Sequence, residues 1–158
     1  MGYNTAFDGE WKLNKPLDGE TKTFLIKLAN TRRMKRTGLD EKYGIEGEFF
    51  VDASGFMGQD SDDSVVDYNQ PPSTQPSLWC KWIPNDEGTA IEWDGGEKFY
   101  DYIPWIEYLI ENILAPRGYV LNGDIKWEGE DSDDFGIIRI EDNVVKCAQG
   151  TKGYMPFN

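Results

Sequence analysis

Carboxylates are the main groups in this chain that could do chemistry, because the sequence contains no histidine. The absence of histidine excludes Ser-His-Asp and Cys-His catalysis, histidine general bases and most zinc or iron sites. The two cysteines, Cys80 and Cys147, fit neither a metal-ligand spacing nor a redox CxxC motif. We therefore expect two free thiols in a cytoplasmic protein, and no bound cofactor.

Three carboxylates near a Gly-Gly bend are the candidate catalytic residues: Glu92, Asp94 and Glu97. At the end of a strand, Glu92 and Asp94 would share one face and Trp93 would point to the other. Such carboxylates could be the acid and base of a glycoside hydrolase, with Trp93 or Tyr100 stacking on a sugar. With a divalent cation they could act on a phosphate ester. The simpler interpretation is a tight turn with Trp93 in the core.

The motif Asp-Ser-Asp-Asp occurs twice, at 60–63 and 131–134, each time shortly before apolar residues. Counting from the start of the second copy, Asp131, Asp133 and the later Asp142 match positions 1, 3 and 12 of a calcium loop. Phe135 at position 5 and the predicted flanking strands exclude an EF-hand. We expect no metal site, with these three carboxylates as the candidates for a looser one. A solvated acidic turn is the simpler alternative.

The segment 67–82 contains three prolines followed by Trp79 and Trp82. Proline makes such a loop stiff and extended, and aromatic side chains dominate the hot spots of protein interfaces. The segment could therefore be a protein-contact surface. The alternative is a loop that wraps over the sheet and buries its tryptophans.

The charge of the chain is strongly negative and unevenly distributed. Its 158 residues include 16 Lys and Arg against 29 Asp and Glu, for a formal net charge of −13. The first 36 residues carry +4 and the rest carry −17. Such a surface repels nucleic acid and anionic lipid and attracts basic proteins, although acidity also serves solubility. The candidate partner-binding residues are acidic or aromatic: Asp60, Asp62, Asp63, Asp67, Tyr68, Trp79, Trp82, Glu130, Asp131, Asp133 and Asp134.

The pattern of elements predicts an α+β fold, with a mostly antiparallel sheet of about five to seven strands and two helices packed on one face. We expect a single domain over 1–150 and a C-terminal tail at 151–158. No apolar run is long enough to span a membrane. The predicted helices are 19–34 and 104–114, and the predicted strands are 3–13, 48–52, 78–83, 89–93, 119–128, 136–140 and 144–148.

Several runs resemble a family of uncharacterised small acidic proteins of bacteriophages and bacterial mobile elements. The runs are 55–60, 67–69, 71–72, 75–82 and 92–100. The resemblance covers most of the chain and carries no assigned catalytic or binding residues. It implies a phage-type setting, in which small acidic proteins bind host factors that include defence nucleases.

These observations favour a non-enzymatic acidic binding protein with a basic protein partner. The hypothesis is a phage-type inhibitor of a host defence or nucleic-acid-binding protein that acts by charge mimicry. Direct binding to duplex nucleic acid or to a membrane is not expected. The alternatives are a carboxylate-based hydrolase and an immunity-type protein against a basic toxin. The sequence does not predict the oligomeric state.

Overall fold

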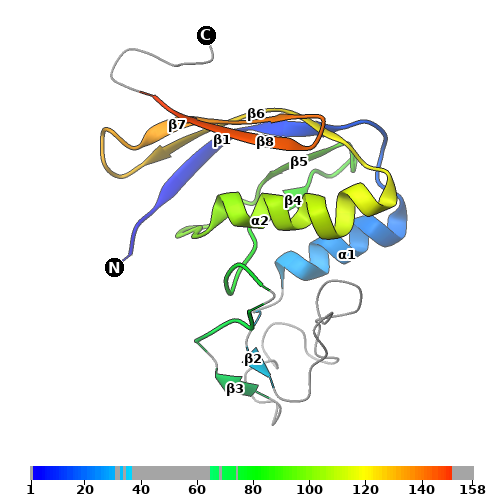
Figure 1. Cartoon of the computed structure of the whole chain (residues 1–158), viewed down its shortest axis with the longest axis horizontal. Coiled ribbons are helices and arrows are strands. Elements are labelled where there is room, and N and C mark those ends of the chain that lie inside the picture. The colour runs from blue at the N-terminus through cyan, green and yellow to red at the C-terminus, as the bar shows by residue number, and fades with distance from the viewer. Residues whose placement is uncertain are drawn as a thin grey trace.

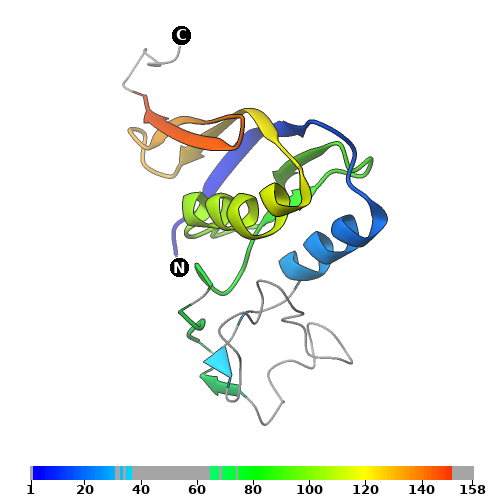
Figure 2. The same cartoon turned by 45° about the vertical axis from the view of Figure 1, so that its right-hand side comes forward.

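A computed structural model describes residues 2–30, 33, 35–36, 65–67, 69–73 and 75–150. Its main feature is an antiparallel six-stranded sheet with the strand order β4-β5-β1-β6-β7-β8. Both helices lie on one face of this sheet in the two views (Figures 1 and 2), so the predicted α+β fold is confirmed. The strands are β1 (Thr5–Leu13), β4 (Trp82–Pro84), β5 (Ala90–Trp93), β6 (Leu121–Gly129), β7 (Phe135–Glu141) and β8 (Val144–Gln149).

A second, two-stranded sheet pairs β2 (Lys35–Arg36) with β3 (Val65–Asp67). The predicted strand 48–52 and the tail 151–158 lie outside the described residues. No helix in the described part of the chain is long and apolar enough to cross a bilayer.

The face of the sheet that meets the helices carries the aromatic core. In β1, Phe7 and Trp11 are buried, and the intervening Asp8 is exposed. Phe7 packs edge-on against Trp82 with 5.0 Å between ring centroids, and Trp11 does so at 4.7 Å. The buried indole of Trp11 has a backbone acceptor, since its Nε1 donates to Ile138 O at 3.1 Å. In the described part of the chain, no helix lies over the opposite face of the sheet, here called the outer face (Figure 1).

Helix α1 (Gly19–Ala29) begins where the sequence predicts and ends five residues earlier. Asp18 is the N-cap and accepts a hydrogen bond from Thr21 N at 2.7 Å, which lowers the pKa of the Asp18 carboxyl. The predicted end at residue 34 is wrong because Arg33 N donates to Leu78 O at 2.9 Å. By residue 33 the chain has left the helix to run beside the later loop.

Helix α2 (Tyr102–Leu109) begins two residues before the predicted start and places Pro104 in its first turn. It continues as a π-helical turn, η2 (Ile110–Leu114), and a 3₁₀ turn, η3 (Ala115–Arg117). The helical segment ends at Gly118, whose φ of 82° is left-handed.

Strands β4 and β5 form one hairpin and β7 and β8 another, and local turn chemistry explains both turns. Strand β4 begins four residues later than the predicted strand 78–83. Between β4 and β5, Asn85 Oδ1 accepts from Thr89 N at 2.8 Å. Between β7 and β8, Asp142 and Asn143 have φ values of 49° and 69°. Two consecutive residues with positive φ are what a type I′ turn requires, and Asp and Asn tolerate that conformation.

Candidate functional site

The three candidate catalytic carboxylates do not converge on a shared cavity. Glu92 lies on the outer face of β5, while Trp93 points to the core side, as predicted. Asp94 is exposed and accepts a hydrogen bond from Gly96 N at 2.7 Å. Glu97 lines a cavity that neither Glu92 nor Asp94 lines. Neither of the two cavities described below is lined by more than one of these carboxylates, whereas acid–base hydrolysis needs two that flank one substrate.

The three candidate metal ligands are also separated. Asp131 and Asp133 lie in the turn before β7, and Asp142 lies in the turn after it. Seven residues of β7 separate these turns, which corresponds to about 23 Å at the usual rise per residue. Within the described residues, no group of three Cys, Asp or Glu side chains is placed to hold a metal ion.

Trp82 belongs to the core, which corrects its prediction as a partner-binding residue. Its side chain is 1% exposed, and its Nε1 donates to Tyr102 O at 2.8 Å. Trp79 is half-buried and lines the same cavity as Glu97. The candidates Asp60, Asp62, Asp63 and Tyr68 lie outside the described residues, and Asp67 is described only as the β3 residue that pairs with Lys35.

The remaining partner-binding candidates lie in one acidic turn: Glu130, Asp131, Asp133 and Asp134. The acidic turn is defined here as residues 128–134, which include the last two residues of β6 and the link to β7. Asp134 holds this turn in place, because its Oδ1 accepts from Trp127 Nε1 at 2.9 Å. Its Oδ2 accepts from Tyr3 Oη at 2.6 Å, and that bond raises the pKa of the Tyr3 phenol. The same phenol oxygen accepts from Asp131 N at 3.1 Å. Asp134 is therefore a structural residue of the turn.

The exposed carboxylates of the acidic turn are Glu128, Glu130, Asp131 and Asp133. The Glu130 side chain accepts a hydrogen bond from Asn4 N, which ties the turn to the start of the chain. Gln149 Nε2 donates to the backbone carbonyl of Asp133 at 2.8 Å, and Asp133 itself is exposed. The turn thus presents negative charge from a fixed backbone.

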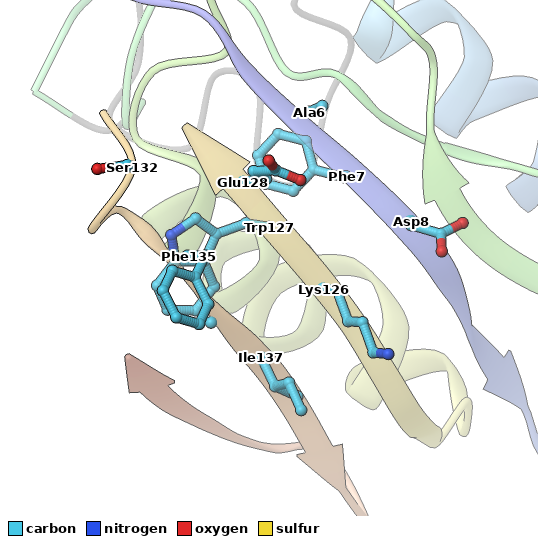
Figure 3. Close-up of a pocket in the computed structure, with 10 residues that line it drawn as sticks. Ala6, Phe7, Asp8, Lys126, Trp127, Glu128, Ser132, Phe135 and Ile137 are labelled. Carbon is cyan, nitrogen blue, oxygen red and sulfur yellow. The ribbon is translucent and has the colours of Figure 1, made fainter. Parts of the chain in front are cut away.

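A groove of about 460 Å³ lies next to the acidic turn on the outer face. Strands β1, β6 and β7 contribute its walls, and Ser132 of the acidic turn closes one end (Figure 3). Its apolar surface comes mainly from Ala6, Phe135 and Ile137, and its charged groups are Asp8, Lys126 and Glu128. A groove with an apolar surface and carboxylates beside it suits a long basic side chain, whose stem is apolar and whose head is charged.

The register explains why these side chains meet. Glu128 pairs with Ala6 of β1 on one side and with Phe135 of β7 on the other. The next outward-facing row contains Asp8, Lys126 and Ile137. Directly paired residues have their Cβ atoms about 5 Å apart, so each row is a continuous strip of side chains.

No family model, curated protein or solved structure matches the chain.

A second cavity, of about 630 Å³, lies between the 69–79 loop and residues 97–101. Its lining includes Trp79 from the first segment and Glu97 and Tyr100 from the second. The loop is held on the helix layer by a buried network in which Arg33 binds Gln75 and Gln75 Nε2 donates to Tyr108 Oη at 3.0 Å. The two segments that line this cavity are apart in the sequence and are neighbours in the structure.

Sequence reasoning missed the residues that line the groove on the outer face. The alternation in β1 indicates that Ala6 and Asp8 face away from the core, and that signal was available. The pairing of Glu128 with Phe135 could not be read locally, because it depends on the register between β6 and β7.

Proposed function

We propose that this chain is a non-enzymatic acidic binding protein that holds a basic segment of another protein. The groove and the adjacent acidic turn form the binding surface. The observation that carries the proposal is the position of a fixed, carboxylate-rich turn beside a groove with an apolar surface. Together they offer both electrostatic attraction and an apolar contact for Lys or Arg side chains.

Preorganisation supports this proposal. Binding loses affinity when a loop must be ordered by the partner. Here the turn is already anchored by Tyr3 and by the indole of Trp127, both through Asp134. The backbone that carries Glu128, Glu130 and Asp133 is therefore in place before a partner arrives, and the cost of ordering the turn is small.

The charge of the whole chain attracts a basic partner from beyond contact distance. A net charge of −13 attracts a basic protein over roughly one Debye length, about 10 Å at 0.1 M salt. A basic surface that binds nucleic acid is the natural partner, because the acidic turn places several negative charges close together, as a phosphate backbone does. We propose that the chain acts by this charge mimicry as an inhibitor of a host defence or nucleic-acid-binding protein. An immunity-type role against a basic toxin uses the same physics.

Titration with a defined basic peptide tests the proposal. Acetylated hexalysine amide is titrated into the protein by calorimetry at about 50 mM and again at about 500 mM salt, where electrostatic attraction is largely screened. We expect binding at low salt and a loss of at least about tenfold in affinity at high salt. The double variant Glu128→Gln and Asp133→Asn should weaken binding at low salt.

The matched control removes two negative charges from the helix layer through Glu107→Gln and Glu111→Gln, both at exposed positions. It should bind within about twofold of the wild type, since these residues lie in the helix layer, on the other side of the sheet from the groove. Equal weakening by both double variants would show attraction by net charge alone and would contradict a defined binding surface.

A further inference from the structure

We propose that the groove on the outer face is an arginine subsite, in which a partner's guanidinium lies on the Phe135 ring and forms a fork with the Glu128 carboxylate. This inference rests on the proposed function and specifies the chemistry of the partner. It distinguishes an arginine-bearing basic segment from one that contains only lysine.

The geometry of the row supports this assignment. Glu128 and Phe135 are directly paired across β6 and β7, and both side chains point away from the core. Figure 3 shows the Phe135 ring and the Glu128 carboxylate on the side of the sheet that faces the groove. With their Cβ atoms about 5 Å apart, a planar cation that covers the ring also reaches the carboxylate.

The proposed contact combines an arginine–carboxylate fork with a guanidinium over an aromatic ring, and the molecule contains an example of each. Two rows along the same face, Arg139 Nε and Nη2 donate to the two oxygens of Asp124 at 2.7 and 2.8 Å. Elsewhere, the guanidinium of Arg117 lies over the Phe24 ring at 5.2 Å. The residue opposite Asp124 is Arg139, whereas the residue opposite Glu128 is Phe135. The Glu128 row therefore supplies a carboxylate and an aromatic ring, and the partner would supply the guanidinium.

The Glu128 carboxylate is available for a cation from outside. Among the described residues it forms neither a hydrogen bond nor an ion pair. Its nearest strand neighbour of opposite charge, Lys126, directs its amine away from Glu128 in Figure 3. The charge of Lys126 instead acts on Asp124, whose pKa is lowered first by the hydrogen bond from Arg139 and further by this lysine.

Arginine suits this row better than lysine for two reasons. Its planar guanidinium is weakly hydrated and stacks on aromatic rings, whereas an ammonium is compact and strongly hydrated. Its fork of N–H donors also matches a carboxylate with two parallel hydrogen bonds. A lysine in the same groove gains the point-charge attraction and the apolar contact of its stem, but neither the planar stacking nor the two parallel hydrogen bonds.

The test compares acetylated hexaarginine amide with acetylated hexalysine amide, which carry equal charge, by calorimetry at about 100 mM salt. We expect the wild type to bind hexaarginine at least about fivefold more tightly than hexalysine. Phe135→Leu should reduce this preference to about twofold or less, because it should weaken hexaarginine binding more than hexalysine binding. Glu128→Gln should weaken hexaarginine more than hexalysine.

Phe24→Leu is the control, because Phe24 is a partly exposed aromatic residue of helix α1, which lies on the other side of the sheet from the groove. This variant should retain the full preference for arginine, and thermal unfolding verifies that each variant is folded. Equal binding of the two peptides by the wild type would overturn the arginine subsite and leave the proposed function standing. Absence of binding by both peptides would instead contradict the proposed function itself.

Discussion

Tyr3 and Asp134 are 131 positions apart in the chain and are joined by a hydrogen bond of 2.6 Å from the phenol to Oδ2. The bond links the start of the first strand to the acidic turn. Because the same phenol oxygen accepts from Asp131 N, a single side chain fixes both ends of the Asp-Ser-Asp-Asp motif. The candidate binding surface consequently depends on a residue that carries no charge at neutral pH.

Removing this phenol should loosen the turn. In Tyr3→Phe, Asp134 loses a donor and Asp131 N loses an acceptor, so we expect faster amide exchange at Asp131 and weaker hexalysine binding. Hydrogen exchange by NMR measures the first effect. The matched control is Tyr119→Phe, which removes a similar phenol bond, from Tyr119 Oη to Asp18 Oδ2 at 2.8 Å, and should leave the Asp131 amide unchanged. Unaltered exchange at Asp131 in Tyr3→Phe would contradict the anchoring role.

The same bond makes stability sensitive to alkaline pH. The pKa of Tyr3 is raised because its protonated phenol donates to the Asp134 carboxylate. A raised folded-state pKa means that the stabilisation is present below the unfolded value, near 10, and is lost as pH rises through the folded value. We expect the stability difference between wild type and Tyr3→Phe to shrink above about pH 10. Denaturant unfolding at a series of pH values measures it, and a difference that stays constant would contradict this linkage.

The fork between Asp124 and Arg139 should contribute modestly to stability. Both side chains are partly exposed, so Asp124→Asn should lower the free energy of unfolding by about 0.5 kcal/mol at pH 7. The pKa of Asp124 is lowered by the hydrogen bond from Arg139, so the contribution is present above the unfolded pKa and lost as pH falls through the folded one. Urea unfolding should show the two proteins converging below about pH 3. Convergence already at pH 6 would argue against the pair.

The two cysteines should differ in reactivity. Burial raises the pKa of Cys80 to about 12, and this side chain is fully buried, whereas Cys147 is exposed on β8. In native protein, Ellman's reagent should modify Cys147 at least about a hundredfold faster than Cys80. Cys147→Ser should abolish the fast phase. A fast phase that persists in this variant would show that Cys80 is accessible.

Gly136 should not tolerate a side chain. A Cβ at this position would overlap the Trp127 indole and the carbonyl of Ala148. Gly136→Ala should lower the free energy of unfolding by about 1–3 kcal/mol, as overpacking of a buried site does. Gly19→Ala is the control, since a Cβ there meets nothing within 4 Å. Thermal unfolding compares the two, and an equally stable Gly136→Ala would mean that β6 and β7 can separate locally.

Elements with local signals could be predicted from the sequence. Asp18 marks the start of α1, and the pair Asp142-Asn143 marks the β7–β8 turn, because cap and turn chemistry depends on neighbouring residues alone. The end of α1 could not be placed, since it depends on the pairing of Arg33 with Leu78, 45 positions later in the chain.

The site was harder to predict because it depends on which face the helices cover. The sequence shows that Trp82 lies in a strand, but only the helix layer determines that this face is the core. The groove requires in addition the register that places Glu128 opposite Phe135. Alternation within one strand cannot supply a register between two strands.

The most direct test of the central claim is to map peptide binding onto the protein by NMR. Hexalysine amide is titrated into ¹⁵N-labelled protein at about 50 mM salt, and backbone amide shifts are followed. The account predicts that the largest changes cluster in the groove and the acidic turn, around Ala6, Glu128, Ser132 and Phe135. Changes confined to the cavity lined by Trp79 and Tyr100, or no changes at all, would contradict it.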